Sequence, residues 1–263
     1  MTILDSVRPA PGLRVLITAG AGGIGAVMAR AFSEAGAFVH VCDIDRAALD
    51  RLSSEHPAIT TSTADASIAR DVDLVFDDVR GTLGGLDVLV NNVGLAGPTG
   101  PIETLDASAW ERTVAVNLNS QFLFTRRAVP MLKASTADPC LIAMSSVAGR
   151  LGYALRTPYA ATKWAVIGLM KSLAIELGPH GVRANAILPG SVAGERMSGV
   201  IAMRAAATGA TPEATREEYL HKTSLRRMVT AEDVAAMALY LCSPAARNVT
   251  GQAISVDANI EYL

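Results

Sequence analysis

An alternation of two patterns along the whole chain constrains the fold more than any other feature. Short apolar runs rich in β-branched residues recur, and longer amphipathic segments lie between them. The short runs predict strands at 13–18, 38–42, 87–91, 140–145, 182–188 and 253–256, with a weaker one at 58–63. The longer segments predict helices at 24–36, 46–55, 68–83, 108–133, 158–177 and 231–243. Strands apolar on both faces and separated by helices are typical of a parallel sheet covered on both sides. We therefore predict one doubly wound α/β domain over residues 1–263, with about seven strands.

Length and charge restrict the partners of the chain. It has 263 residues, of which 50% are hydrophobic and 18% charged, and its formal net charge is −2. A protein so close to neutral has no long-range field to draw it to nucleic acid or to an anionic membrane. We expect a small-molecule partner, and neither nucleic acid nor membrane.

The remaining composition predicts a soluble, cytoplasmic protein. The N-terminal segment carries Asp5 and two prolines where a signal peptide needs a continuous apolar run. No other segment offers about 18 uninterrupted apolar residues. The three cysteines lie far apart in apolar runs, as is usual for buried thiols in a reducing compartment; they are Cys42, Cys140 and Cys242. No histidines pair at metal-ligand spacing, so no metal site is predicted.

The stretch TPYAATKWAV, residues 157–166, places a phenol and an ammonium four residues apart. On a helix, Tyr159 and Lys163 lie one turn apart on one face. We predict such a helix, with Thr157 as its N-cap and Pro158 at its first position. A tyrosine that takes a proton from an alcohol near neutral pH must be acidified, because its free pKa is about 10. Two charges about 4 Å apart at an effective dielectric near 20 interact by roughly 4 kcal/mol, or about three pKa units, so one lysine is sufficient.

A glycine-rich turn, TAGAGGIG at residues 18–25, follows the first predicted strand and opens a helical pattern. Glycines let a pyrophosphate approach the N–H groups of a helix N-terminus, where the dipole favours negative charge. The alternative is a plain tight turn. Asp43 closes the second strand, 23 residues after Gly20, where a carboxylate can bind a ribose and repels the 2′-phosphate of NADP. NAD is thus favoured over NADP, with a helix N-cap as the other role for Asp43.

These motifs occur together with NNVG at 91–94, a serine thirteen residues before YAATK, LPG at 188–190 and TGQAISVDA at 250–258. In this combination, which runs nearly end to end, the sequence resembles the short-chain dehydrogenase/reductase family. The resemblance implies a single Rossmann-like domain, a nicotinamide cofactor, hydride transfer at a carbinol carbon and commonly a tetramer.

The resemblance also assigns residues by position. It implies a catalytic set of Asn117, Ser146, Tyr159 and Lys163, in which Asn117 maintains a proton route and Ser146 holds the substrate oxygen. Ser145 is the competing serine, and a surface asparagine is the alternative for Asn117. The implied cofactor-binding residues are Ala19, Gly20, Gly23, Ile24, Gly25, Asp43, Ile44, Asp65, Asn92, Gly94, Tyr159, Lys163, Pro189, Gly190 and Val192.

Four positions depart from the family pattern. Ala19 stands where the pattern places a glycine directly after the threonine, and Ala258 stands at another usual glycine. Gly194 replaces a threonine that often bonds the nicotinamide amide, and Val93 replaces the usual alanine. These departures bear on cofactor geometry and on packing at the chain end.

Residues 195–228 form a long connection where the family has its substrate lid. Two amphipathic stretches split by Gly209 and Pro212 predict two short helices that close over the site. Arginines near the catalytic tyrosine can read a carboxylate or phosphate, although solvated arginines are the alternative. The candidate substrate residues are Arg150, Tyr153, Arg156 and Arg196.

We therefore predict an NAD-dependent oxidoreductase that interconverts a secondary alcohol and a ketone, on a small polar metabolite such as a hydroxy acid, polyol or sugar derivative. The alternatives are an NADPH-dependent carbonyl or 3-oxoacyl reductase and a non-catalytic NAD-sensing protein of the same fold. The helix at 158–177 is apolar on more than one face, which predicts a homo-oligomer, a tetramer before a dimer.

Overall fold

The computed structural model describes residues 2–261 and contains one seven-stranded sheet in the order β3-β2-β1-β4-β5-β6-β7. Every neighbouring pair of strands is parallel. The strands are β1 (Arg14–Thr18), β2 (Phe38–Asp43), β3 (Ile59–Thr63), β4 (Val88–Asn91), β5 (Cys140–Met144), β6 (Arg183–Pro189) and β7 (Ala253–Val256). The predicted fold class is confirmed; Met1 and residues 262–263 of the predicted domain lie outside the described residues.

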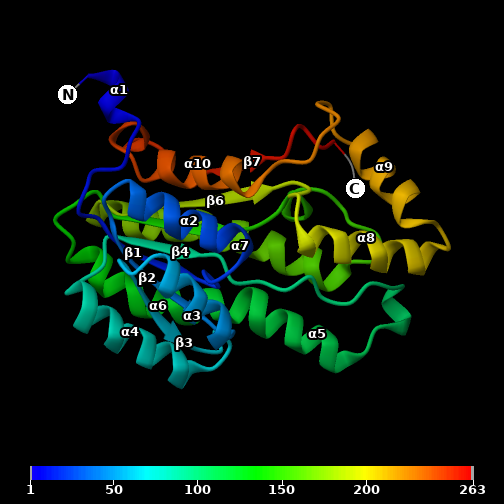
Figure 1. Cartoon of the computed structure of the whole chain (residues 1–263), viewed down its shortest axis with the longest axis horizontal. Coiled ribbons are helices and arrows are strands. Elements are labelled where there is room, and N and C mark those ends of the chain that lie inside the picture. The colour runs from blue at the N-terminus through cyan, green and yellow to red at the C-terminus, as the bar shows by residue number, and fades with distance from the viewer. Residues whose placement is uncertain (1, 262–263) are drawn as a thin grey trace.

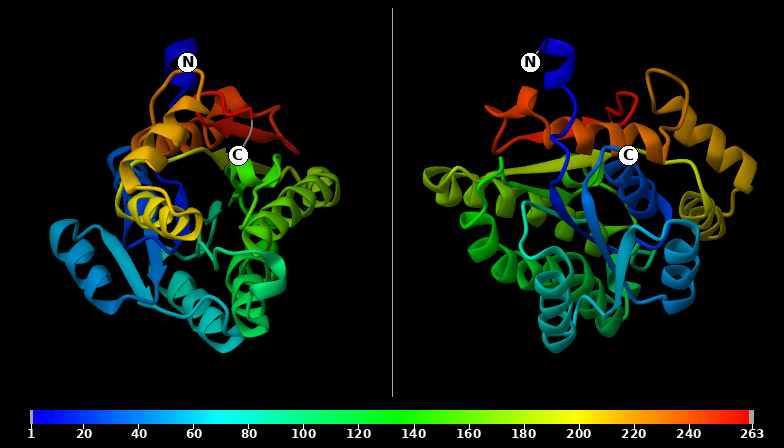
Figure 2. Two further views of the ribbon diagram at one scale, coloured as in Figure 1. Left: turned by 90° about the vertical axis from the view of Figure 1, so that its right-hand side faces the viewer. Right: turned by 60° about the vertical axis from the view of Figure 1, so that its left-hand side comes forward.

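Helices cover both faces of the sheet (Figure 1). One face packs against α2 (Gly23–Glu34), α3 (Arg46–Glu55) and α10 (Ala231–Leu241). The other packs against α4 (Ala69–Leu83), α6 (Ser120–Lys133) and α7 (Thr157–Leu177). The remaining helices are α1 (Ile3–Ser6), α5 (Ala107–Val114), α8 (Glu195–Thr208) and α9 (Pro212–His221). Figure 1 and the right-hand view of Figure 2 show α8 and α9 standing out at one end of the molecule, beyond the sheet.

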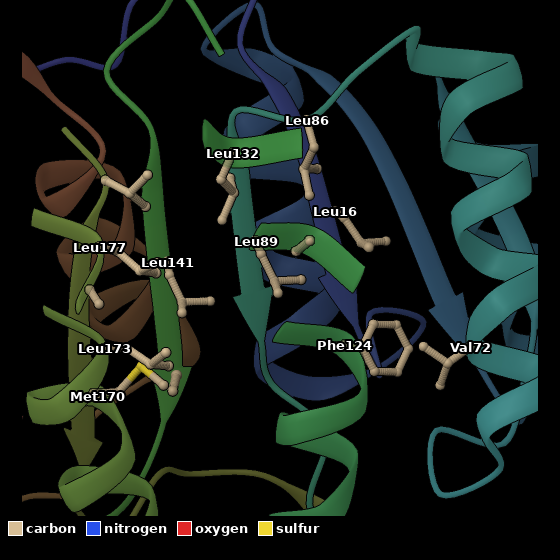
Figure 3. Packing of buried hydrophobic residues seen from close by; sticks show 14 of the residues in the cluster. Leu16, Val72, Leu86, Leu89, Phe124, Leu132, Leu141, Met170, Leu173 and Leu177 are labelled. Carbon is tan, nitrogen blue, oxygen red and sulfur yellow. The ribbon is translucent and has the colours of Figure 1, made fainter. Parts of the chain in front are cut away.

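Alternation along each strand builds two separate cores. In β1, Val15 and Ile17 face the α2 side while Leu16, between them, faces the α4 side. Figure 3 shows Leu16 and Leu89 from the sheet packing toward Phe124 of α6, with Met170 and Leu177 of α7 in the same cluster. Full burial of each such side chain stabilises the fold by roughly 1.5–3 kcal/mol, which is why both faces of these strands are apolar.

No helix in residues 2–261 is long and apolar enough to cross a membrane.

A polar clamp joins the amino ends of the central strands. Asp87, directly before β4, accepts hydrogen bonds from the Arg14 backbone N–H at 2.9 Å and from Arg14 Nη2 at 2.6 Å. The Ser135 hydroxyl donates to the same carboxylate at 2.7 Å. Burial by itself raises the pKa of Asp87, but the bonds from Arg14 and Ser135 outweigh burial and hold the pKa below its usual value.

Two sequence predictions about helices are wrong in detail. The segment predicted as one helix from 108 to 133 is α5 and α6 joined by η2, a π-helical turn at Ala115–Asn119. Thr157 is the first residue of α7 and not its N-cap, which is Arg156; no side-chain bond caps this helix, and the buried Thr157 hydroxyl has no partner. A residue already in helical conformation cannot turn its hydroxyl back to the first free N–H groups.

Candidate active site

A cavity of about 630 Å³ opens at the carboxyl edge of the sheet, between the end of β1 and the two helices α8 and α9. This is the place where ligands bind in doubly wound folds, because the direction of chain winding reverses between β1 and β4. The predicted site residues that line it are Ala19, Gly23, Ile24, Asp43, Asn92, Gly94, Ser146, Tyr153, Arg156, Tyr159, Lys163, Pro189, Gly190, Val192 and Arg196. Most of the predicted site is thus brought together in one cleft.

The glycine turn leaves room for a ligand at the start of α2. The N-cap is Gly22, which has no side-chain bond to the first N–H groups and has no atom within 4 Å of where a Cβ would lie. Gly25 is required for packing, because a Cβ there would meet the Ala19 carbonyl at 2.2 Å. Ala19 has φ 49°, in the left-handed region that glycine adopts without strain. Free N–H groups, a helix dipole and open space together fit a pyrophosphate.

Asp43 shapes this turn from the end of β2. Its carboxylate accepts from the backbone N–H of Ala21 at 3.1 Å and of Asp45 at 3.1 Å, and it lines the cavity. The N-cap of α3 is Asp45, which accepts from the N–H of Ala48 at 3.0 Å. Asp45, and not Asp43, is therefore the N-cap of α3. Arg46 is exposed and pairs with Asp50, as expected for a side chain that points to solvent.

Tyr159 and Lys163 lie together on α7 at the wall of the cavity. Lys163 Nζ is 5.7 Å from the Tyr159 ring centroid and donates to the Met144 carbonyl at 2.7 Å. Burial by itself raises the pKa of Tyr159, but the positive charge of Lys163, then that of Arg196, and a hydrogen bond with Ser146 lower it below its ordinary value. Burial also lowers the pKa of Lys163. The electrostatic pairing expected from the spacing is present.

The two serines after β5 face different ways. The Ser145 hydroxyl donates to the Lys163 carbonyl at 2.7 Å, which ties β5 to α7. The Ser146 hydroxyl accepts from the Ala148 N–H at 3.2 Å and hydrogen-bonds to Tyr159. Of the two, Ser146 is the one placed beside the tyrosine hydroxyl.

Asn117 is completely buried in the π-helical turn, so it is not a surface asparagine. Its side chain accepts from the Leu95 N–H at 2.8 Å and donates to the Leu95 carbonyl at 3.1 Å. It also donates to the Thr162 hydroxyl at 3.2 Å, on the helix that carries Lys163. Asn117 therefore lies in a local distortion of the helix and links the segment after β4 to α7.

Arg156 lines the cavity beside Tyr153 and Tyr159. Its guanidinium carbon lies 5.3 Å from the Tyr153 ring centroid and 5.1 Å from that of Tyr159. The hydroxyl of Tyr153 hydrogen-bonds at 2.5 Å to that of Tyr219, on α9. Burial raises the pKa of Tyr153, so the Tyr153 hydroxyl remains protonated. Arg196, at the start of α8, is exposed and donates to the Gly94 carbonyl at 2.8 Å.

Several predicted site residues lie elsewhere. Arg150 is exposed, as is Ile44, and neither lines the cavity. Asp65 pairs with Arg112 and accepts from Ser67, also away from the cavity lining, so its contact with an adenine stays a prediction. Those that support the walls from behind are Gly20, Gly25 and Asn117.

Sequence reasoning missed four residues of segment 195–228 that line the cavity. They are Glu195, Met197, Val200 and Tyr219. Tyr219 carried a usable signal, because it is the one aromatic residue in the polar helix α9, PEATREEYLH, and such a residue must find something to pack against.

Fold and site together define a nicotinamide-dependent oxidoreductase. A family model described as Enoyl-(Acyl carrier protein) reductase matches residues 19–258. The short chain dehydrogenase/reductase dpchG of Colletotrichum higginsianum is 34% identical over 253 residues, covering 94% of this chain and 92% of that protein. Galactitol 2-dehydrogenase of Agrobacterium fabrum is 33% identical over 243 residues, covering 92% and 94%. The solved structure of a 7α-hydroxysteroid dehydrogenase complexed with NADH and 7-oxo glycochenodeoxycholic acid has a TM-score of 0.89 at 28% identity, covering 99% of this chain and 98% of that one.

The chain belongs to the short-chain dehydrogenase/reductase family. It is an oxidoreductase that interconverts a CH–OH group and a carbonyl.

Proposed function

We propose that the chain is an NAD-dependent dehydrogenase of a small polar secondary alcohol, with Asn117, Ser146, Tyr159 and Lys163 as its catalytic set. The observation that carries the proposal is the position of Tyr159, whose pKa is depressed by Lys163 and which lies beside Ser146 at the cavity wall. A protein that only sensed NAD would need no acidified phenol, so this observation argues against the non-catalytic alternative.

The residues of the chain divide the proton chemistry between them. The Ser146 hydroxyl holds the substrate oxygen, and Tyr159, as its phenolate, takes the proton from the alcohol. Lys163 stabilises that phenolate through its charge. Asn117 holds Leu95 and Thr162 around the lysine and keeps open a proton route toward solvent. When bound, NAD supplies the acceptor for the hydride that leaves the carbinol carbon.

Asp43 supports NAD as the cofactor. Its carboxylate is held by two backbone N–H groups at the cavity edge, at the end of β2, where the ribose of a dinucleotide is recognised. A 2′-phosphate placed there would meet this negative charge, while Arg46, the nearest cation in the sequence, is engaged with Asp50.

We also propose a polar substrate, a lid and a homotetramer in the cytoplasm. The galactitol relative supports a polar metabolite. Met197 and Tyr219 come from residues 195–228 and line the cavity, which supports closure of this segment over the substrate. Exposed apolar side chains on α6 and α7 support an oligomer.

Replacement of the phenol tests the assignment of the proton carrier. Tyr159→Phe removes only the hydroxyl, so we expect kcat to fall by about 10²–10⁴-fold while NADH binding changes little. The assay is NAD reduction with a panel of secondary alcohols, including hydroxy acids, polyols and 3-hydroxyacyl thioesters. Tyr240→Phe, on α10 and outside the cavity, is the matched control. Activity that survives in Tyr159→Phe would show that another residue carries the proton.

Cofactor choice is tested at Asp43. Asp43→Asn keeps the hydrogen-bond acceptor and removes the charge, so the ratio of NADP to NAD use in kcat/KM should rise by about tenfold or more. Asp45→Asn, two residues away at the helix cap, should leave the ratio unchanged. Tighter binding of NADPH than NADH by the unmodified protein, measured by fluorescence, would support the NADPH-dependent reductase instead.

A further inference from the structure

A buried arginine at the substrate end of the cavity lacks an anionic partner. Arg156 is only 4% exposed, and in residues 2–261 the single hydrogen bond of its side chain is from Nη2 to the Ala96 carbonyl at 2.6 Å. Its Nε is buried with no partner, and none of the ion pairs within residues 2–261 includes it. Contact with the faces of the Tyr153 and Tyr159 rings offsets part of the cost of burying this charge. Burial of a charge costs more than this unless it is paired.

A second arginine of the cavity wall, Arg196, binds the same backbone segment as Arg156. Arg196 donates to the Gly94 carbonyl and Arg156 to the Ala96 carbonyl, two residues along the same strand-end segment. Leu95, between those residues, is held at both its N–H and its carbonyl by Asn117. Three side chains thus bind this segment, and two of them are positively charged arginines that line the cavity.

The carboxylates of the cavity wall do not neutralise these arginines. Two line it, Asp43 and Glu195. Asp43 is bound to backbone N–H groups at the glycine turn, and Glu195 is exposed at the start of α8, in none of the ion pairs of residues 2–261. On the opposite side Tyr219 lies between Arg204 and Lys222, at 5.7 and 5.8 Å from its ring centroid, and both cations pair with Glu218.

The position of Arg156 is accompanied by strain in the backbone beside it. Leu155, directly before it, has φ 65°, which is strained for a bulky side chain. Its carbonyl accepts from the Gly100 N–H at 2.9 Å, so the strained turn is tied to the segment after β4. Strain of this kind persists where the surrounding structure requires a particular side-chain position.

We infer that the substrate of the proposed dehydrogenase is a short hydroxycarboxylic acid, whose carboxylate is bound by Arg156 and Arg196 while its carbinol meets Tyr159 and Ser146. The inference rests on the proposed function of the same site. A guanidinium within 5.1 Å of the Tyr159 ring centroid leaves space for only a few bonds between carboxylate and carbinol. Planar arginine forks suit a carboxylate, and Ala96, Val147 and Val200 provide apolar walls for a short aliphatic chain.

The test compares acids with their neutral esters. The panel is 2-hydroxybutyrate, 3-hydroxybutyrate and 4-hydroxypentanoate, each beside its methyl ester, assayed with NAD in the unmodified protein. We expect at least one acid to exceed its ester in kcat/KM by about 10- to 100-fold. Arg196→Ala, at an exposed position, and Arg156→Lys, which keeps the charge, should lower the ratio of acid to ester kcat/KM by about tenfold or more, because any effect of these arginines on the pKa of Tyr159 acts on acid and ester alike. Arg150→Ala removes an exposed arginine from the same connection outside the cavity and should leave this ratio unchanged.

Three results would overturn the inference: esters used as well as acids, acid and ester affected equally by both arginine substitutions, or a preference that Arg150→Ala also removes. If neutral alcohols are oxidised without any preference for acids, the inference fails and the proposed function stands. If the protein oxidises no secondary alcohol, the proposed function fails, and calorimetric titration of 3-hydroxybutyrate into the NAD-loaded Tyr159→Phe protein decides the inference. Binding that Arg196→Ala weakens supports it, and absence of binding overturns it.

Discussion

Two alanines that depart from the family pattern occupy backbone positions suited to glycine. Ala19 has φ 49° and Ala258 has φ 57°. A left-handed conformation costs an alanine roughly 1–2 kcal/mol, so the family's glycine at each position has a physical reason. The turn at residues 18–25 therefore carries backbone strain at Ala19.

Relief of that strain is measurable. Ala19→Gly should raise the free energy of unfolding by up to about 1 kcal/mol, because the folded conformation no longer strains the residue. Ala21→Gly is the matched control, since Ala21 lies in the same turn without a positive φ. It should lower stability by a few tenths to about 1 kcal/mol through the entropy of the unfolded chain. The measurement is urea unfolding, and equal effects of the two substitutions would contradict the strain.

Single residues were predictable where a regular element set their direction. Four-residue spacing on a helix was enough to pair Tyr159 with Lys163, because helical geometry leaves little freedom. The connection from β5 to α7 has no period, so its two arginines were indistinguishable: Arg150 faces solvent and Arg156 the cavity. Tyr219 is 60 residues from Tyr159 in the sequence, and only tertiary packing brings its helix to the site.

At the scale of elements, a polar seam joins β2, β3 and α4 on the face of the sheet that α4 covers. His40 hydrogen-bonds to Thr60 at 2.7 Å and to Ser62 at 2.8 Å, and Ser62 donates to Asp78 of α4 at 2.5 Å. Burial lowers the pKa of His40 from 6.5 to about 4, although the charge of Asp78 acts to raise it. The folded protein therefore keeps this histidine neutral where the unfolded chain protonates it.

The seam makes stability sensitive to mild acid. As pH falls from about 6.5 to about 4, the unfolded state binds a proton that the folded state excludes, so stability falls by up to about 3 kcal/mol. His40→Gln should lower stability at pH 7 by about 1 kcal/mol and reduce the loss between pH 7 and pH 5. The measurement is the urea midpoint at each pH, with exposed His180→Gln as control. An unchanged pH dependence in His40→Gln would contradict this assignment.

Periodicity predicted the helices themselves, but not their interruptions. The residues AVNLN of η2 have no glycine or proline that would mark a break, and the π-helical turn follows from the burial of Asn117 against Leu95. Thr157 precedes a proline as a cap would, yet α7 begins one residue earlier than that pattern indicates. The first difference depends on the contact of Asn117 with a distant segment.

At the scale of the molecule, α7 has a second apolar face. Trp164 is 51% exposed and Ile175 is 81% exposed, eleven residues apart and so on nearly the same side of the helix. Phe122 of α6 is also exposed. We propose that the homotetramer covers these apolar side chains.

Charge on this face should disrupt the proposed tetramer. The double substitution Trp164→Glu and Ile175→Glu places two carboxylates in the expected contact, so the molar mass from light scattering should fall to that of a dimer or monomer. Leu74→Glu, an equally exposed apolar site on α4, should leave the mass unchanged. A monomeric unmodified protein, or an unchanged mass in the double variant, would contradict the assembly.

The architecture as a whole was the most predictable level. Strands apolar on both faces require cover on both sides, and parallel neighbours require helical crossovers, so the alternation of segments left few arrangements open. The placement of α8 and α9 over the cavity was less determined, because their packing depends on the tyrosine and arginine contacts described above.

The Arg14, Asp87 and Ser135 cluster lies at the amino ends of the central strands, at the far end of the sheet from every residue of the cavity. The cluster that joins the strands and the residues that line the cavity are therefore separate in space. Segment 195–228 could be exchanged, by engineering or in evolution, to change the alcohol that the protein accepts without altering this cluster.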